Sequence, residues 1–444
     1  MNVGLVDLKI RQHKELMVFW SLCALFGVLV ILKYRHETAF FADDWTIFGS
    51  RLEQWERFGF DDFVLRRHNE HLMGGMVLWD VGLAKIFGLH NYLPWLISVQ
   101  IANSFVCWVL FRYMTRIGTA GLVAAVVSPF FMIWAPLNSN SYWAPEAIFS
   151  ISLACIMLHF SYLVLKPTSN KTLILGSLIA LIGIFVHSIC AVLIPISVMV
   201  LLVQKRWRSA FIASLPLAMY GLWFLTYQNL PTANRWMATS ESAVSQKRDF
   251  QLFFSFSEKI LSRTIWLHSS TLLALLFVAF VSIGFCICFR RGKEKRLIAI
   301  CAIIAAGIFL FGFFWSRAYA FEIFNWDPPG RYAGVILMLL FPLAIVPVTT
   351  VGHWMQASLV LPQNIRYAIA VSGICIALLI NSFHRENYDK EYFNFANWEN
   401  TRIKEVAADP ALSSYDDSEL VFGDSIWVDM TYGDIERLVR LGWL

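Results

Sequence analysis

Residues Phe40–His71 read FFADDWTIFGSRLEQWERFGFDDFVLRRHNEH, and they follow the apolar run Leu16–Leu32. That run is long enough to cross about 30 Å of hydrocarbon, so the polar stretch should emerge on the far side of a membrane. It holds two adjacent carboxylates, Asp43 and Asp44, within the densest polar chemistry that precedes the C-terminal region. We interpret it as the first outward-facing loop of a membrane protein, and the rest of the chain as its scaffold.

Two helices are expected inside this loop. Apolar residues recur at helical spacing after Asp44 and make one stripe, which consists of Trp45, Phe48, Leu52 and Trp55. The polar residues of the opposite face are Arg51, Glu53 and Glu56. A second stripe runs through residues 72–86. We expect both helices to lie along the membrane surface. Asp43 and Asp44 would open the first helix and His68–His71 the second, with a polar turn at Phe60–Arg67 between them.

Each polar candidate in the loop has two readings. Asp43 and Asp44 could be reactive carboxylates, or they could cap the helix by accepting hydrogen bonds from its free backbone amides. His68, Glu70 and His71 could share a helical face and bind a divalent metal ion, or they could be the solvated start of a helix. The sequence leaves both alternatives open.

Composition places the whole chain in a membrane. The 444 residues are 58% hydrophobic and 16% aromatic, with a mean hydropathy of +0.58, which is too apolar for a soluble enzyme of this size. The net charge of +5 comes from basic residues dispersed among short loops, where the positive-inside rule puts them. We therefore expect membrane lipids as partners and no nucleic acid. All eight cysteines fall inside apolar segments, so we expect no disulfide framework.

An all-α fold with about eleven membrane-spanning helices is expected. Lys9, Arg11 and Lys14 precede the first span, which predicts a cytoplasmic N-terminus, and no cleavable signal peptide is expected. The apolar stretch Thr172–Val203 is too long for one crossing, so we divide it near His187 into two spans. The other spans are Leu16–Leu32, Pro94–Tyr113, Gly118–Ala135, Ala147–Leu165, Ala210–Tyr227, Trp266–Phe289, Leu297–Trp315, Ala333–Val351 and Tyr367–Asn381.

Three further outer segments follow from this topology. The connection at residues 138–146 is short and ends at Glu146, which could line a sugar site or belong to an ordinary helix connection. The loop at residues 228–264 is basic although it faces outward, so a phosphate-bearing ligand is one explanation and tolerance of charge in a long loop is another. The loop at residues 316–332 ends in Pro328-Pro-Gly-Arg-Tyr332, which puts Arg331 at the mouth of a span.

The region 382–444 differs from the rest of the chain. It carries thirteen acidic and six basic residues with aromatic residues between them. We expect a small extracytoplasmic α/β region that packs onto the outer loops, because about 60 residues barely form a core of their own. One strand is expected at Leu420–Met430 and one helix at Gly433–Leu444. The membrane module would then be residues 1–381, with outer loops at 34–93, 228–264 and 316–332.

This plan resembles the GT-C superfamily of membrane glycosyltransferases. The matching features are the architecture along most of the chain and three short motifs, which are Phe41-Ala-Asp-Asp-Trp45, Arg67-His-Asn-Glu-His71 and Pro328-Pro-Gly-Arg-Tyr332. The chain lacks a WWD-type motif and has only a small C-terminal region, which disfavours transfer to protein. The resemblance implies transfer of a sugar from a polyprenyl-phosphate donor to a glycan or glycolipid acceptor, at the outer face of the cytoplasmic membrane.

The chemistry of individual residues is compatible with this activity and suggests their roles. Asp43 or Asp44 would be the general base for the acceptor hydroxyl. Arg331, Arg317 and Tyr332 would bind the donor phosphate. His68, Glu70, His71 and Glu146 would be acceptor or accessory residues, and a divalent metal ion is a further candidate cofactor. Two alternatives remain, which are an envelope polysaccharide polymerase or ligase with lipid-pyrophosphate donors, and a lipid or sugar transporter.

Overall fold

A computed structural model gives the structure of residues 3–36, 38–40, 43–68, 71–133, 143–166, 169–230, 250–263, 271–323, 330–358, 386–422 and 430–444. For some residues in these ranges, among them Asp43 and Glu146, only the backbone is described. The described ranges are mostly helical and contain no β-strand. They contain two isolated β-bridges, His68 with His71 and Leu420 with Thr431.

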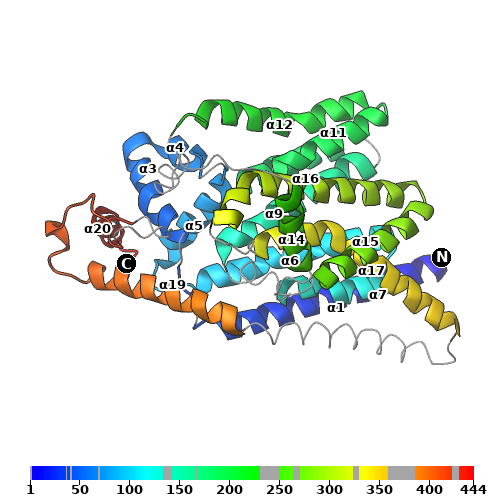
Figure 1. The fold of residues 1–444 in the computed structure, drawn as a ribbon, viewed down its shortest axis with the longest axis horizontal. Helices are drawn as coiled ribbons and strands as arrows, with labels where there is room; N and C mark the ends of the chain where they lie inside the picture. Colours follow the sequence, from blue (N-terminus) through cyan, green and yellow to red (C-terminus); the bar gives the residue numbers. More distant parts are fainter. Residues whose placement is uncertain are drawn as a thin grey trace. The chain divides into compact units, whose positions relative to one another are not determined.

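Long apolar helices make the chain a multi-pass membrane protein (Figure 1). Seven segments of the described residues are long and apolar enough to span a bilayer. They are Gln12–Tyr34 in α1 (Val3–Tyr34), α6 (Leu93–Ile117), Ala147–Leu165 in α9 (Ala144–Phe160) and η4 (Ser161–Leu165), α12 (Trp207–Tyr227), α15 (Thr271–Arg290), Lys293–Trp315 in α16 (Lys293–Ile323), and Tyr332–Val351 in α17 (Gly330–Ser358). Three shorter apolar helical segments are Gly121–Ile133, Asn170–Val186 and Ala191–Val203.

These ten segments coincide with ten of the eleven predicted spans. The eleventh, Tyr367–Asn381, lies outside the described residues, so the count of eleven stays a prediction. The predicted break near His187 is confirmed, because α10 (Asn170–Val186) ends one residue before it and His187 has an extended backbone. The chain resumes as η5 (Ser188–Leu193) and α11 (Ile194–Val203).

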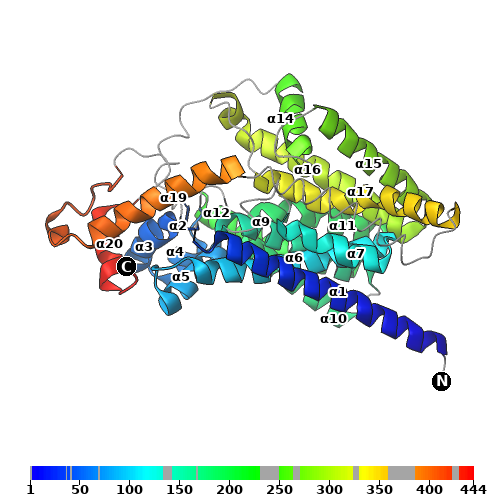
Figure 2. The same cartoon turned by 90° about the horizontal axis from the view of Figure 1, so that it is seen from below.

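The chain forms two compact units. The first comprises residues 1–30, 100–141 and 246–386. Its central pair is α15 and α17, which meet so closely that a Cβ atom at Gly284 would collide with the carbonyl oxygen of Leu343. Beside them, α14 (Phe250–Arg263) packs on α16 through the ring of Phe256, whose centroid lies 6.0 Å from that of Phe314 (Figure 2).

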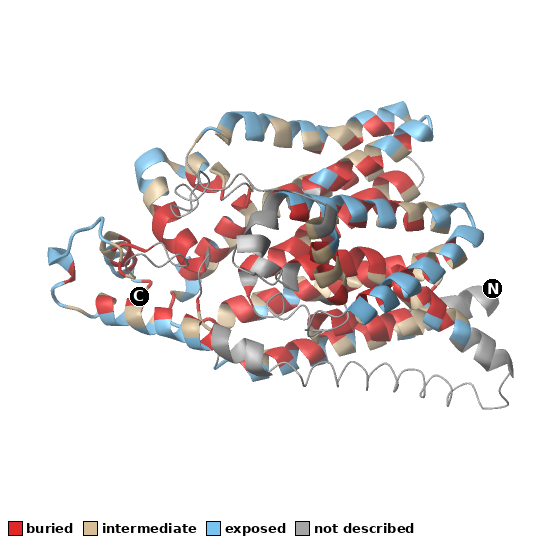
Figure 3. Ribbon diagram, viewed as in Figure 1, coloured by how far each residue is buried: buried red, intermediate tan, exposed pale blue. Residues whose placement is uncertain are grey.

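The second unit comprises residues 31–99, 142–245 and 387–444, and it contains the first loop. Its helices α9 and α10 pack tightly, since a Cβ atom at Gly183 would lie 2.8 Å from the Cβ of Cys155. Helix α12 keeps a row of large apolar side chains exposed along its length (Figure 3), as a helix surface that faces lipid does. Those side chains are Trp207, Phe211, Leu215, Met219, Leu222 and Leu225.

The first loop is more helical than predicted. Its first helix runs without interruption through α2 (Asp43–Thr46), the π-helix η1 (Ile47–Arg51) and α3 (Leu52–Phe58), so the prediction that Asp43 opens it is confirmed. The predicted polar turn at Phe60–Arg67 is wrong, because most of it forms the short helix α4 (Phe60–Leu65). The predicted second helix is α5 (Gly74–Phe87), and the prediction that His68–His71 open it is wrong, because His68 and His71 form a β-bridge before the helix. The apolar stripe of the first helix is packed inside the protein, with Trp45, Phe48 and Leu52 buried.

The C-terminal region contains a helix that the sequence analysis missed, α19 (Glu386–Ala407). The predicted C-terminal helix exists as α20 (Tyr432–Arg440). Of the predicted strand, the described part shows only a single bridge between Leu420 and Thr431, and residues 423–429 lie outside the described residues. Both helices lie against the first loop in Figures 1 and 2, as the packing prediction expected. The side-chain amide of Asn400 in α19 donates to the carbonyl oxygen of Phe40 at 2.6 Å.

Candidate functional site

Asp44 is a fully buried carboxylate at the start of the first-loop helix. Its Oδ2 accepts a hydrogen bond of 3.1 Å from the indole Nε1 of Trp143. Trp143 immediately precedes α9, which already includes Glu146, so the predicted position of Glu146 in a loop is wrong. The bond therefore ties the first loop to the start of another candidate span. The side chains of Asp43 and Glu146 lie outside the described residues.

The two predicted loop histidines form a compact backbone bridge. The amide of His68 donates to the carbonyl of His71 at 2.8 Å, and the reverse bond is 3.0 Å long. The imidazole centroid of His71 lies 4.6 Å from that of His187, at the break between α10 and η5. The ring of Phe149 covers His187 from α9, with the centroids 4.2 Å apart. The structure thus brings a first-loop histidine to a second histidine that the sequence analysis had used only to divide a span.

Backbone hydrogen bonds fix this contact. The amide of Ser188 donates to the carbonyl of Leu72 at 3.1 Å, and the amide of Leu72 donates to Oγ of Ser188 at 3.0 Å. The hydroxyl of Ser152 donates to the carbonyl of His187 at 2.7 Å. Because Gly74 and Gly75 lack side chains, the start of α5 can approach Phe185 and Val186 at the end of α10, where an added Cβ would clash. The first loop is therefore docked firmly onto α10.

The histidine pair is a poor metal site as far as it is described. Within the described residues, no group of three or more His, Cys, Asp or Glu side chains is placed to hold a metal ion. Glu70, the predicted third ligand beside His68 and His71, lies outside those residues. Two imidazoles alone are fewer ligands than a zinc site uses.

An aromatic cluster surrounds the loop beside Asp44. The ring of Phe40 stands at its centre, with neighbouring ring centroids 4.8 to 5.6 Å away in edge-on geometry. Those neighbours are Trp45, Phe48, Tyr92 and Trp95. Such pairs add stabilisation beyond their area burial. The cluster makes the first-loop helix a rigid support for the carboxylate that it carries.

Buried polar groups with unmet hydrogen bonds are concentrated in the same loop. Among the described residues of this loop, such atoms include Nε1 of Trp45, Nε and Nη2 of Arg51, Oε1 of Gln54 and Oδ2 of Asp80. Native proteins leave few such atoms, and those that remain call for a functional or solvent explanation. The sequence analysis missed Asp80, whose only signal is a single acidic residue within the apolar stripe of residues 72–86. It had placed Arg51 on a polar face.

Burial shifts the ionisation of both charged groups. It raises the pKa of Asp80 to about 8, opposed by the hydrogen bond of 2.8 Å that Nε1 of Trp95 donates to Oδ1. It lowers the pKa of Arg51 to about 9, assisted by the nearby Arg66 and opposed by Asp62. Ionisable groups perturbed by burial in this way mark candidate functional sites.

The predicted phosphate-binding residues belong to the other compact unit. Arg317 lies beyond the end of its span at Trp315, as predicted, but the segment is helical there because α16 continues to Ile323. Arg331 is the second residue of α17, at the helix start as predicted. The side chains of both lie outside the described residues. The ring of Tyr332 is buried, with its centroid 4.4 Å from that of Phe313.

Comparisons with known proteins leave the site to be interpreted from its geometry. No protein-family model matches the chain, and a search of curated proteins gives no match. The geometry shows a buried, anchored carboxylate, two adjacent imidazoles and incompletely bonded charged groups within one loop and the helices that hold it. Such groups can accept a proton and stabilise developing charge.

Proposed function

We propose that the protein is a membrane glycosyltransferase of the GT-C type. It would move a sugar from a polyprenyl-phosphate donor to an envelope glycan or lipid-linked acceptor at the outer face of the cytoplasmic membrane. The observation that carries the proposal is the buried Asp44 carboxylate, which Trp143 holds at the start of a first-loop helix in a multi-pass protein. An anchor of this kind fixes the start of the helix, and with it the backbone of the neighbouring Asp43, which a general base requires.

The two aspartates have different roles in this proposal. Because Asp44 is fully buried and bonded to Trp143, its position fits anchoring of the helix. We therefore assign the general base to Asp43. In the reaction, the acceptor oxygen forms a bond to the anomeric carbon and the bond from that carbon to the phosphate oxygen breaks. The acceptor proton goes to Asp43, and the bonding electron pair leaves with the polyprenyl phosphate.

The charge on the leaving phosphate requires cations. Arg331 and Arg317, with the basic loop at residues 228–264, remain our candidates for this role. Tyr332 is a weaker candidate than the sequence suggested, because its ring is buried against Phe313. His71 and His187 are accessory candidates for positioning the acceptor, since their rings lie in contact with each other.

The test is sugar transfer in membranes supplied with labelled polyprenyl-phosphate sugars. Asp43→Asn should lower the rate about 10²- to 10⁴-fold, the contribution of a general base. Asp44→Asn and Trp143→Phe should each lower it less, because they loosen the helix and leave the base in place. Asp61→Asn is the matched control, since Asp61 is an exposed carboxylate of the same loop. Normal transfer by Asp43→Asn at equal membrane abundance would refute the assignment.

Transport of a lipid or sugar is the second candidate function. The observation in its favour is the break between α10 and η5, where buried His187 interrupts an apolar stretch of residues 172–203, as binding sites in transporters do. Counterflow of labelled sugar into proteoliposomes, with no transfer from any phosphate or pyrophosphate donor, would favour transport. Transfer from a lipid-pyrophosphate donor alone would instead indicate a polymerase or ligase.

A further inference from the structure

Arg51 is the most deeply buried cation of the first loop. It ends the π-helix η1 and has no exposed surface. Its Nη1 donates one hydrogen bond of 2.9 Å to the carbonyl oxygen of Phe63 in α4. Its Nε and Nη2 have no hydrogen-bond partner. A guanidinium offers five N–H groups in a planar fork, so most of its hydrogen-bonding capacity is unused.

The charges around Arg51 do not balance. Its nearest charged influences are Arg66 and Asp62, and these two already form an ion pair of 2.8 Å with each other. Two arginines therefore share one carboxylate in a site that is almost closed to solvent. A buried cation without a paired anion is costly. An anion of higher charge than one carboxylate would remove this imbalance.

The helix that covers Arg51 is short and bounded by irregular backbone. Helix α4 has six residues, and it starts after Gly59, whose φ of 97° suits glycine. At its other end Arg66 is extended. The Asp62–Arg66 pair keeps 13% and 11% of its side-chain surface exposed, whereas Arg51 has none exposed. A ligand arriving from outside would meet Arg66 first and would displace Asp62 to reach Arg51.

The same helix stands where the chain enters the basic second loop. Nε1 of Trp223, near the end of α12, donates to the carbonyl of Leu65 at 2.6 Å. Nε of Arg67 donates to the carbonyl of Leu230 at 3.0 Å. Both bonds hold the end of α12 to the residues that flank Arg66. The cations of the first loop and the beginning of the second loop are therefore neighbours.

We propose that Arg51 and Arg66 form a binding site for a phosphate group, in which the phosphate replaces Asp62 between the two guanidinium groups. Planar guanidinium groups bind phosphate oxygens by paired hydrogen bonds, which uses the N–H groups of Arg51 that lack partners. The identification of the ligand as an isoprenoid phosphate rests on the proposed function. The phosphate site itself rests on the contacts of Arg51, Asp62 and Arg66.

The experiment measures binding of three probes to the purified full chain in detergent, by native mass spectrometry. The probes are farnesyl phosphate, inorganic phosphate and phosphatidylglycerol, with farnesol as the uncharged control. Arg51→Met should weaken binding of farnesyl phosphate at least about tenfold, and Arg51→Lys should weaken it less, because a lysine keeps the charge and loses the fork. Asp62→Asn should strengthen binding about threefold to tenfold, since a competitor for the arginines is removed.

Arg57→Gln is the matched control. Arg57 lies on α3 of the same helical run, is 68% exposed and pairs with Glu53 at 2.6 Å, so its loss should leave binding unchanged. If Arg51→Met proves too unstable to purify, Asp62→Asn and Arg51→Lys test the site without removing charge from the arginine position. Binding of inorganic phosphate with the same dependence on Arg51 would support the site and identify free phosphate as its source.

Three results would overturn the proposal. They are equal binding of farnesyl phosphate by the native chain and Arg51→Met, weaker binding by Asp62→Asn, and phosphatidylglycerol binding that matches farnesyl phosphate and ignores Arg51. Failure of the proposed function looks different. Normal sugar transfer by Asp43→Asn, together with Arg51-dependent phosphate binding, would refute the glycosyltransferase mechanism and leave the phosphate site standing.

Discussion

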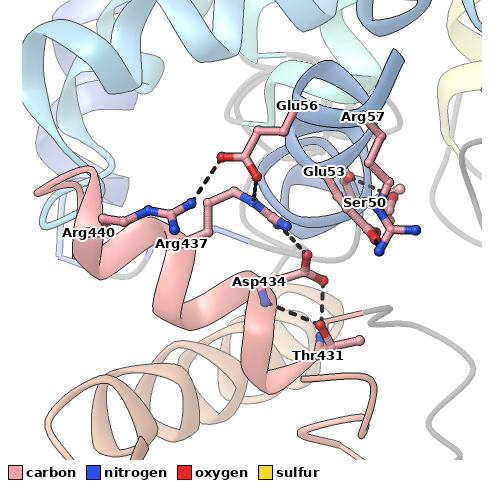
Figure 4. Close-up of polar contacts among 9 residues, drawn as sticks. Ser50, Glu53, Glu56, Arg57, Thr431, Asp434, Arg437 and Arg440 are labelled. Carbon is pink, nitrogen blue, oxygen red and sulfur yellow. Dashed lines mark hydrogen bonds and ion pairs between the residues drawn. The ribbon is translucent and has the colours of Figure 1, made fainter. Parts of the chain in front are cut away.

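Two charged groups at the first loop differ in how far other protein groups pair their charges. At α3, Glu56 accepts hydrogen bonds from Arg437 at 2.9 Å and from Arg440 at 3.1 Å, and Arg437 also pairs with Asp434 at 2.7 Å (Figure 4). One helical turn earlier, Arg51 has a single carbonyl as its partner. We call the first group, Glu56 with Asp434, Arg437 and Arg440, the clamp. The second group, Arg51 with Asp80, is the loop interior.

The pKa values of Arg437 and Arg51 show the same difference between the clamp and the loop interior. Burial lowers the pKa of Arg437, but Glu56 and Asp434 outweigh this effect, so its pKa lies above the usual value. For Arg51 burial dominates and the pKa falls to about 9. The clamp satisfies its charges with protein groups, which is what a structural contact requires. The loop interior leaves donors and an acceptor unused, and such groups are available to a ligand or to water.

The largest expected effect is a dependence of the free energy of unfolding on pH, caused by Asp80. Because its folded pKa is raised from 3.8 to about 8, the folded state holds a proton that the unfolded chain has released. Its contribution to stability is therefore complete below pH 3.8 and is lost as pH rises towards 8. We expect the free energy of unfolding in mixed micelles to fall by several kcal/mol over that interval.

Asp80→Asn is the control for this prediction. It keeps an acceptor for the indole of Trp95 and removes the titrating group. The free energy of unfolding should therefore fall less steeply between pH 3.8 and 8 than in the native chain. An unchanged slope in this variant would show that other groups cause the pH dependence, and that Asp80 is ionised in the folded protein.

The next largest effect is a difference in stability between substitutions of the two arginines of the clamp. Arg437→Gln should lower the free energy of unfolding by about 2–3 kcal/mol, because it leaves the buried carboxylate of Asp434 without its cation. Arg440→Gln should change it by less than about 0.5 kcal/mol, since exposed ion pairs contribute little. The side chains of Arg437 and Arg440 are 13% and 69% exposed. Equal effects of the two substitutions in chemical unfolding would refute a structural clamp.

The smallest effect compares two glycines of the loop. A Cβ at Gly49 would lie 2.7 Å from Sδ of Met430 and 3.0 Å from Oδ2 of Asp434, so Gly49→Ala should destabilise the protein by about 1–2 kcal/mol. Gly82 on α5 has open space around it, and Gly82→Ala should stabilise by about 0.5 kcal/mol. Thermal unfolding of both variants tests the contact. If Gly49→Ala leaves the stability unchanged, α20 can shift to make room for the added methyl group.

Local patterns predicted much of this architecture. The helix that opens at Asp43 and the break at His187 follow from apolar periodicity and from the length that a bilayer allows. Burial of Arg51 could not be predicted in the same way. A π-helix occupies Ile47–Arg51, and its i to i+5 bonding changes the angular position of every later side chain. The assumption of an α-helical period therefore assigned Arg51 to the solvated face.

Long-range contacts account for the other omissions. Trp143 reaches Asp44 across 99 residues, and His187 reaches His71 across 116 positions of the chain. Neither pairing has a local signal. The predicted surface helix at Trp45–Trp55 had an apolar stripe that a membrane or a protein could cover equally well. Rings distant in the sequence, those of Trp95 and Trp443, pack on Phe48 and cover this part of the stripe with protein, while Trp55 stays exposed.

The clamp also imposes a delay on synthesis. Arg437 follows Glu56 by 381 residues, so a ribosome adding about 5–20 residues per second needs roughly 20–80 s to supply the partner of a loop that is already made. During this time Gly49 and the carboxylate of Glu56 lack the contacts of α20. We expect the nascent first loop to be a preferred target for chaperones and proteases until the clamp forms. Whether proteases can attack this loop would then depend on whether synthesis has reached α20.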